Sequence, residues 1–401
     1  MAGPLDGVRV LDLTSVVMGP YATSVLADLG ADVIKVEPPG GEVMRKSGPM
    51  RHRDMGHFYL AINRNKRSVV LDLKHSQGRE ALLRLAADCD VLVYNIRPQA
   101  MERLGLSYDS LREVNPRILY VGAYGFSQNG PYAARPAYDD LIQGMCGIPW
   151  LSQQGGADKP RYAPMVLVDR MVGLQLCNAI TTGLFHRERT GPGQRIDVPM
   201  FEGMLSIVLG EHLAGRQFEP AVGPPGYQRS LAHDRRPYRT KDGWLCVLVY
   251  NDKHWRSFFA AIGRVAQFEA DARFHTQNSR LTNIDHVYGY LSDVLATRTT
   301  AEWLQMFEQA DIPAARMYDI EDMLADEHVR ATDFVREVEH PSEGKLRVTA
   351  IPTEWSASVP LHRRHAPRAG ENTREVLREF GFTEDEIETL EAAGAACQVS
   401  P

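Results

Sequence analysis

The sequence predicts an α/β protein with an open, mostly parallel sheet, followed by a smaller α+β region. Residues 8–13 form a short apolar strand, 19–29 have the pattern of a helix, and 31–37 form a second strand that ends in an acid. A strand, a helix and a strand of these lengths form a βαβ unit, which requires parallel strands. The pattern recurs, so we expect helices on both faces of the sheet.

The same alternation continues through the first half of the chain. Further strands are predicted at 68–73, 91–94, 118–122 and 195–198, and helices at 78–87, 175–188 and 200–214. Residues 218–226 are rich in Pro and Gly and have the composition of a linker. The segment 237–249 contains two apolar stretches joined by Lys241-Asp242-Gly243, which is typical of a β-hairpin.

Helices are expected after this hairpin, near 254–262 and 301–310, which favours a smaller α+β domain over residues 225–330. The segment from 331 onward is predicted to be helical and polar, with helices at 372–380 and 384–392, and to return to the large domain. That domain is therefore expected to be discontinuous and to contain residues 1–224 and 331–401. A chain of 401 residues exceeds one ordinary core, in agreement with two domains.

Composition and charge argue against several classes of partner. Hydrophobic residues make up 44% of the chain, charged residues make up 24%, and the net charge is −6. The chain therefore lacks the basic excess that would indicate a nucleic acid or an anionic membrane as partner. The five cysteines are scattered without a CxxC pair, which predicts free thiols and no metal site. We see neither a signal peptide nor a stretch of membrane-spanning length, so we expect a cytoplasmic protein.

The first βαβ unit lacks the glycines of a dinucleotide site. That fingerprint requires G-x-G-x-x-G between strand and helix, and between Leu13 and Ala22 the chain has only Gly19. Glu37 ends the second strand as a ribose-binding acid does, but without the glycines it is better interpreted as a solvated strand end. A nicotinamide dehydrogenase is therefore disfavoured, and NADH binding would test it.

Polar residues follow the strands where open α/β sheets bind ligands. Asn95 and Arg97 come directly after the strand 91–94, Arg103 follows in the next helix, and Lys74 follows the strand 68–73. The three cations can face phosphates, and the Asn95 side chain can hold an amide group. For any one of these residues, an ordinary place on the surface is an equally good interpretation.

One carboxylate, Asp169, interrupts the apolar run 163–173. A carboxylate among apolar groups is costly unless it is paired or used, and one that is used can be a covalent nucleophile. On spacing alone, a helix N-cap is the more common role for such a residue.

Several motifs together indicate a family. They are residues 4–13, 19–20, 29–37, 63–68, 95–98, 138–144, 191–194 and 242–244. With them the chain resembles, over nearly its whole length, the class III CoA transferases (CaiB/BaiF-like proteins), the family that also includes the α-methylacyl-CoA racemases. The resemblance implies a Rossmann-like large domain built from both ends of the chain and an interlocked homodimer. It also implies that Asp169 is the catalytic nucleophile.

The resemblance further implies that the N-terminal βα loops hold CoA. The implied contacts are Val16, Val17, Met18, Leu71, Lys74, Asn95, Arg97 and Arg103. Many members carry Arg where this chain has Pro38, so one phosphate or adenine contact is missing or replaced. The implied chemistry uses CoA as a substrate and needs no metal or other cofactor.

Tyr138 separates the two chemistries of this family. The racemases use a His just before an Asp to move the α-proton, and this chain has Tyr138 in that position. A tyrosine ordinarily has a pKa near 10, so the racemase interpretation loses its proton carrier. We therefore expect transfer of CoA from an acyl-CoA to a carboxylic acid, through an anhydride and an aspartyl-CoA thioester on Asp169. An acyl-CoA racemase acting at the α-carbon is the alternative, and a non-catalytic CoA-binding protein is disfavoured by the presence of Asp169.

The two acids are harder to name. Arg51, His52, Arg53 and His57 gather after the second strand, and Arg235 and Arg236 precede the hairpin. Such cations can bind a distal carboxylate, which suggests a dicarboxylyl-CoA such as succinyl-CoA as donor and a small or branched acid as acceptor. Salt bridges on the surface explain the same residues equally well.

Overall fold

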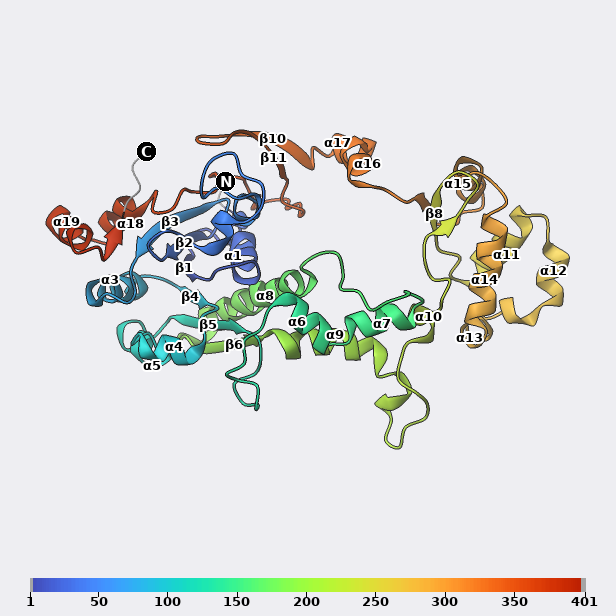
Figure 1. Cartoon of the computed structure of the whole chain (residues 1–401), viewed down its shortest axis with the longest axis horizontal. Helices are drawn as coiled ribbons and strands as arrows, with labels where there is room; N and C mark the ends of the chain where they lie inside the picture. The colour runs from blue at the N-terminus through green and yellow to red at the C-terminus, as the bar shows by residue number, and fades with distance from the viewer. Residues whose placement is uncertain (1–2, 398–401) are drawn as a thin grey trace. The chain divides into compact units, whose positions relative to one another are not determined.

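The computed structural model describes residues 3–397, which fall into two compact units (Figure 1). Within these residues, unit 1 contains 3–143, 165–205 and 328–397, and unit 2 contains 144–164 and 206–327. Compact units are groups of contacting residues and need not fold on their own. The domain boundaries predicted at 225 and 330 therefore stay a prediction.

Unit 1 is built on a seven-stranded sheet whose order is β12-β3-β2-β1-β4-β5-β6. Its strands are β1 (Arg9–Leu13), β2 (Asp32–Glu37), β3 (Lys66–Leu71), β4 (Val91–Tyr94), β5 (Leu119–Tyr124), β6 (Arg195–Pro199) and β12 (Ala396–Cys397). All neighbours pair in parallel except β12, which runs antiparallel to β3. The predicted open parallel sheet is therefore confirmed. Because the strand order reverses between β1 and β4, the loops after these two strands flank the place where such sheets bind ligands.

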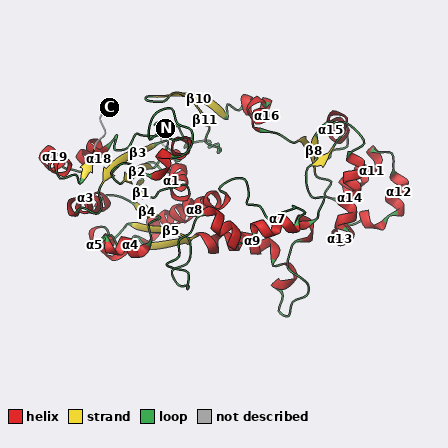
Figure 2. Ribbon diagram, viewed as in Figure 1, coloured by secondary structure: helices red, strands yellow, loops and turns green. Residues whose placement is uncertain are grey.

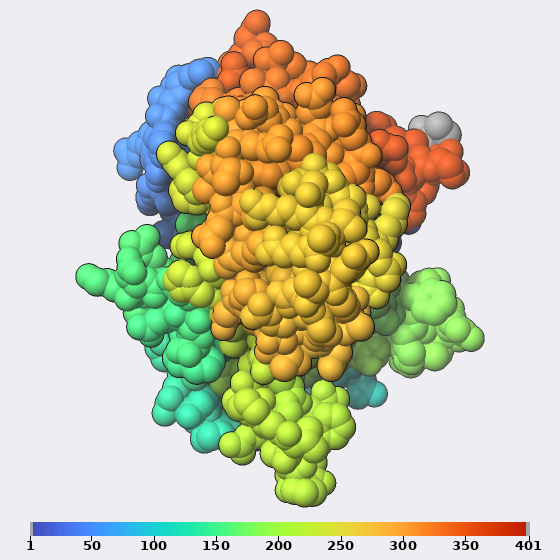
Figure 3. Space-filling model, turned by 90° about the vertical axis from the view of Figure 1, so that its right-hand side faces the viewer, coloured from blue at the N-terminus to red at the C-terminus, as the bar shows by residue number. Residues whose placement is uncertain are grey.

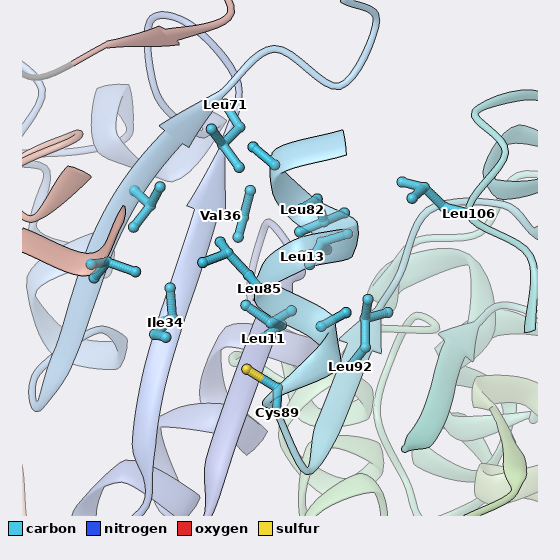
Figure 4. Packing of buried hydrophobic residues seen from close by; sticks show 14 of the residues in the cluster. Leu11, Leu13, Ile34, Val36, Leu71, Leu82, Leu85, Cys89, Leu92 and Leu106 are labelled. Carbon is cyan, nitrogen blue, oxygen red and sulfur yellow. The ribbon is translucent and has the colours of Figure 1, made fainter. Parts of the chain in front are cut away.

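The core explains why the strands are nearly continuous apolar runs, since both sheet faces are covered. On one face, Leu11 lies between Ile34 and Leu92 in the register of the three central strands, and all three side chains are fully buried (Figure 4). Helices α3 (Ser76–Ala87) and α5 (Tyr108–Val114) pack on this face through Leu82 and Leu111. Each fully buried Leu or Ile contributes about 1.5–3 kcal/mol.

Both ends of the chain contribute to this layer. Helices α18 (Thr373–Glu379) and α19 (Glu384–Ala392) add Val376 and Ile387 to the same core, and β12 lies against β3 (Figure 1). Helices α1 (Met18–Asp28) and α8 (Leu167–Thr190) pack against each other.

The segment after residue 331 is helical where we named helices, since α18 and α19 match the predicted 372–380 and 384–392, but it is not helical throughout. It contains an antiparallel hairpin of β10 (Val335–His340) and β11 (Gly344–Thr349) before the two C-terminal helices. Intermediate and exposed positions alternate along β11 with a period of two, which is the period of a strand. The charged residues at the exposed positions hid this pattern among residues typical of a polar helix.

Shorter elements connect the strands of unit 1. They are η1 (Val43–Lys46), α2 (His57–Ile62), α4 (Pro98–Arg103), α6 (Asp139–Met145), α9 (Met200–His212) and α17 (Glu327–Ala331), of which α6 and α9 continue into unit 2. None of the helices within the described residues is long and apolar enough to cross a membrane.

Unit 2 combines helices with a small antiparallel sheet (Figure 2). The strands are β7 (Tyr238–Arg239), β8 (Trp244–Val247) and β9 (Ala314–Arg316), and β7 and β8 form the predicted hairpin. The helices are α7 (Ile148–Gln154), η2 (Ala214–Gln217), α10 (Gln228–Leu231), α11 (Asp252–Ala261), α12 (Val265–Ala270), η3 (Ala272–Phe274), α13 (Gln277–Thr282), α14 (Ile284–Leu295), α15 (Thr300–Gln309) and α16 (Ile320–Ala325). An aromatic cluster that includes Trp255, Phe258 and Trp303 fills the core of this unit, whose surface is mostly yellow and orange in Figure 3.

Candidate active site

A pocket of about 230 Å³ opens at the carboxyl ends of β1 and β4 and contains Asp169 in its wall. The residues of this wall that sequence analysis predicted are Val16, Val17, Met18, Asn95, Arg97 and Asp169. The loop after β1 and the loop after β4 supply five of them, and the first turn of α8 supplies the carboxylate. Five of the eight predicted CoA contacts thus share one pocket with the predicted nucleophile.

Asp169 is buried, with 8% of its surface exposed. Helix α8 begins at Leu167, and its N-cap is Val166, so Asp169 lies within the first turn and is not the cap. Burial and the nearby Asp139 raise the pKa of Asp169 to about 7, while Arg170 opposes the rise. Water stabilises the charge of such a carboxylate poorly, and a perturbed pKa of this kind makes Asp169 a candidate for a functional role.

A second buried carboxylate, Asp139, organises the start of α8. Its Oδ1 accepts a hydrogen bond from the backbone N–H of Asp169 at 2.9 Å, and its Oδ2 accepts one from Nε2 of Gln143 at 2.6 Å. Asp139 thereby satisfies an N–H that the helix leaves unpaired in its first turn. Sequence analysis did not single out this residue, since its role depends on a contact across thirty positions.

The other three predicted contacts lie outside this pocket. The Leu71 side chain is buried in the core at 1% exposure, so a contact with CoA would have to come from its backbone. Lys74 lies exposed in the loop after β3, and Arg103 lies exposed at the end of α4. Their binding of CoA stays a prediction.

Asn95 has a role that the sequence did not reveal. Its Oδ1 accepts the backbone N–H of Ser15 at 3.0 Å, and its Nδ2 donates to the carbonyl of Ser15 at 2.8 Å. Both ends of the amide are therefore engaged with the loop after β1. The side chain joins the two loops of the pocket and is less available to a ligand than we predicted.

Two cations and a phenol line the pocket beside these groups. Arg97 and Arg135 are both exposed, and the guanidinium of Arg135 stacks on the ring of Tyr132, with Cζ 3.9 Å from its centroid. Tyr138 lines the same pocket and is 68% exposed. Arg135 was missed by sequence analysis because nothing in its local sequence places it near Asp169.

Two of the cations that we considered for a distal carboxylate are engaged elsewhere. Arg51 bonds the backbone carbonyl of Glu343, and Nδ1 of His52 lies 3.2 Å from the carboxylate of Glu343. Arg53 is exposed beside Asp54. Neither Arg51 nor His52 lines the Asp169 pocket, which favours their interpretation as structural partners. No group of three His, Cys, Asp or Glu is placed to hold a metal ion within residues 3–397.

Comparison with known proteins identifies the family. The chain matches the family described as CoA-transferase family III over residues 5–373. The chain belongs to CoA-transferase family III. An acyl-CoA transferase of Fusarium pseudograminearum is 33% identical over 96% of this chain and 86% of its own length. The succinyl-CoA:glutarate CoA-transferase of Mus musculus is 32% identical over 98% of this chain and 90% of its own length.

The fold agrees with this assignment. The crystal structure of the hypothetical protein Rv3272 from Mycobacterium tuberculosis superposes with a TM-score of 0.80 at 31% identity, and covers 94% of this chain and 99% of that one. The protein is therefore a family III CoA transferase, and the pocket around Asp169 is its candidate active site.

Proposed function

We propose that this family III CoA transferase moves CoA from an acyl-CoA to a free carboxylic acid by covalent chemistry on Asp169. The observation that carries the proposal is a buried carboxylate, with a pKa raised to about 7, in the wall of a pocket at the switch point of the sheet. A carboxylate so poorly solvated gains more by forming a covalent bond than one in water.

The first half of the reaction transfers CoA to the enzyme. A carboxylate oxygen of Asp169 attacks the thioester carbon, the C–S bond breaks, and CoA leaves as a thiolate from a mixed anhydride. The thiolate then attacks the Cγ carbon of Asp169. The first acid leaves as a carboxylate, and an aspartyl-CoA thioester remains.

The second half reverses these steps with the acceptor. The acceptor carboxylate attacks Cγ of Asp169, which releases CoA thiolate and forms a new anhydride. The thiolate attacks the acyl carbon of that anhydride, so the new acyl-CoA forms and the Asp169 carboxylate is restored. Each step exchanges one activated carboxyl derivative for another, so the proposal needs CoA as a substrate and no further cofactor.

Water has to be kept from the anhydride, because hydrolysis would end the exchange. Val168 and Val172 are fully buried beside Asp169 on α8, and they support this exclusion. Met165, which lies just before α8, is 56% exposed in the single chain and would need a cover to contribute. A second copy of the chain is therefore part of the proposal.

We propose the interlocked homodimer of the family for this chain. Helix α8 exposes Leu174 and Phe185, at 46% and 64% of their surface. The two residues are eleven positions apart, which places them on one face of the helix. Large apolar side chains exposed on one helix face are a feature of interfaces between subunits, although Asn178 and Thr181 lie between these two. Light scattering of the purified protein should give the mass of two chains, and a monomer with full activity would contradict this.

We also keep a cytoplasmic location as a proposal.

For the substrates, we propose a dicarboxylyl-CoA donor such as succinyl-CoA. The name of the mouse relative specifies succinyl-CoA and glutarate, and both Arg97 and Arg135 line the pocket of this chain. One guanidinium can face a phosphate of CoA while the other pairs with a distal carboxylate. We therefore propose a dicarboxylic acid as acceptor too.

The test is trapping of the covalent intermediate. Incubation with succinyl-CoA, followed by mass spectrometry of peptides, should find CoA on Asp169, and hydroxylamine should convert this residue into a hydroxamate. Asp169→Ala and Asp169→Asn should lose CoA exchange by at least about 10³-fold, the usual scale for a lost nucleophile. The matched control is Asp140→Asn, an exposed carboxylate in the first turn of α6, which should keep activity. Full activity without Asp169, or an adduct elsewhere, would refute the proposal.

The racemase alternative has its own readout. Incubation of a 2-methylacyl-CoA in D₂O without any acceptor acid should leave the α-hydrogen in place if the enzyme only transfers CoA. Exchange of that hydrogen at the rate of CoA transfer would instead show that Tyr138 or Asp169 moves a proton.

A further inference from the structure

The loop after β1 is held by side chains from outside it. Asp12 Oδ1 accepts the backbone N–H of Thr14 at 2.9 Å, and Lys35 Nζ donates to the carbonyl of Thr14 at 2.9 Å. Asn95 bonds both the N–H and the carbonyl of Ser15. Asp12 and Lys35 are fully buried and lie side by side in the register of β1 and β2. Every backbone polar group of Thr14 and Ser15 is thus paired with a side chain.

The next residue, Val16, has a backbone conformation that valine rarely adopts. Its φ is +70°, in the left-handed region where a β-branched side chain crowds the main chain. Such a conformation persists only when its surroundings enforce it. The group that contacts it is Glu42, whose Oε2 accepts the N–H of Val16 at 3.2 Å.

Glu42 is itself well anchored. It is 4% exposed, its backbone N–H donates to Oε2 of Glu37 at 3.0 Å, and its Oε1 lies 3.8 Å from Nζ of Lys35. Glu37 is not the solvated strand end that we expected, since it is 1% exposed and paired with Arg45. The carboxylate of Glu42 therefore has little freedom to move away from Val16. A buried carboxylate is costly to keep. Packing alone therefore does not account for a carboxylate placed against the backbone N–H of a strained residue.

The segment that begins at Val16 forms part of the candidate active site. Val16, Val17 and Met18 line the pocket of Asp169, and α1 begins at Met18. If Val16 relaxed to an ordinary extended or helical φ, the chain would leave the loop in another direction. Val17 would then move relative to Asp169 without any substitution among the residues that line the pocket.

We propose that Glu42 is a positioning residue of the CoA transferase. By holding Val16 in its left-handed conformation, Glu42 fixes the pocket wall of residues 16–18 in the shape that binds acyl-CoA. The proposal rests on the proposed function, since it assumes that acyl-CoA binds in the pocket of Asp169. Glu42 acts only through Val16 and does not itself contact the substrate.

Steady-state kinetics of three variants test this role. Glu42→Ala should raise the KM for acyl-CoA at least about 10-fold with a fall in kcat of less than about 3-fold. Glu42→Gln retains an oxygen that can accept the Val16 N–H, so it should recover most of the lost affinity. A merely structural role would lower the amount of active enzyme, and hence kcat, with the KM unchanged.

Val16→Gly completes a double-mutant cycle. Glycine adopts a φ of +70° without strain, so Glu42→Ala should raise the KM less than about 3-fold when Val16 is already glycine. Coupling of this kind is expected only for groups that act on each other. If the two effects simply multiply, Glu42 does not act through Val16 and the proposal is wrong.

Thermal unfolding tests the backbone strain at Val16 even if the Glu42→Ala variant does not fold. Val16→Gly relieves a strained residue, so its Tm should rise. The matched control is Ala214→Gly, which relieves another apolar residue in the left-handed region, at a φ of +44°, outside the pocket. It should also raise the Tm but leave the KM unchanged. A Tm for Val16→Gly equal to or below that of the wild type would overturn the inference of strain.

The proposed function can fail separately. Loss of the Asp169 adduct in the wild-type enzyme would remove the covalent mechanism whatever Glu42 does. A normal adduct together with an unchanged KM in Glu42→Ala would leave the mechanism intact and remove only the positioning role.

Discussion

Asp139 Oδ1 accepts the backbone N–H of Asp169 at 2.9 Å, so one buried carboxylate caps the helix turn that carries the other. The hydrogen bond fixes where the main chain of Asp169 lies, and the negative charge of Asp139 raises the pKa of Asp169. Positioning and electrostatics therefore come from the same side chain. Substitutions at Asp139 can separate the two effects.

The first prediction concerns the pH dependence of activity. Only the ionised Asp169 can attack a thioester, and its pKa is raised to about 7. We expect kcat/KM for acyl-CoA to rise with a slope near 1 in log–log form below pH 7 and to level off above it. In Asp139→Asn an oxygen can still accept the Asp169 N–H but the charge is gone, so the acidic limb should move to lower pH.

Asp139→Ala is the companion to that variant. It loses the cap as well as the charge, and a lost cap costs about 0.5–2 kcal/mol. Its plateau activity should fall, whereas that of Asp139→Asn should fall little. An acidic limb that stays at the wild-type pH in both variants would mean that the limb does not report Asp169.

The second prediction concerns stability. The folded pKa of Asp169, about 7, lies above the unfolded value near 3.9, so the folded state holds this proton more tightly. Stability from this group is greatest below pH 4 and is lost as the pH rises to 7. Asp169→Asn removes the penalty, and at pH 8 it should raise the free energy of unfolding by at most about 4 kcal/mol. The gain should vanish near pH 4, and denaturant titrations at the two pH values would measure it.

The sheet could be predicted from the sequence because its information is local. Buried parallel strands such as β1 and β4 are continuous apolar runs between turns, and the structure places both within one residue of the expected bounds. The hairpin of β10 and β11 could not be predicted as easily. Its alternation of apolar and charged residues is short, and the same residue types suit a polar helix.

The residues of the candidate site show the same difference between local and long-range information. Asp169 was predicted because a lone carboxylate in an apolar run is visible in the sequence, and the resemblance to a family named its role. The contact of Asp139 is with a residue 30 positions away, that of Arg135 with one 3 positions away, and that of Glu42 with one 26 positions away. Of these, the long-range contacts with backbone N–H groups leave no pattern in the sequence. Asn95 lines the pocket of Asp169, but its amide holds Ser15, a role that only the structure reveals.

The third prediction concerns the packing of α1 against α8. A Cβ on Gly173 would lie 2.9 Å from the carbonyl oxygen of Met18 and 2.9 Å from Cδ1 of Tyr21. A backbone oxygen cannot yield easily, so Gly173→Ala should push the helices apart and move Asp169, one turn earlier on α8, away from Met18. We expect a loss of about 1–3 kcal/mol in stability and a clear fall in kcat, measured by denaturant titration and CoA-exchange assays.

A second helical glycine provides the control. A Cβ on Gly289 in α14 would come no closer than 3.7 Å to Oδ2 of Asp234. Gly289→Ala should therefore gain about 0.5–1 kcal/mol without loss of activity. Equal behaviour of the two variants would show that the approach of α1 to α8 at Gly173 does not matter for the site.

The last prediction concerns recognition of the acid. Arg135 lines the pocket, is exposed, and is stacked on Tyr132, so its guanidinium is already oriented when a distal carboxylate arrives. Arg135→Gln should raise the KM for succinate or glutarate by about 10-fold or more, since a hydrogen bond to a charged group is worth about 1.5–3 kcal/mol. The KM for a monocarboxylic acid of equal length should change little, because that acid has no second charge to pair. An equal rise in KM for both acids, or a rise only for acyl-CoA, would assign Arg135 to CoA and leave the distal carboxylate to Arg97.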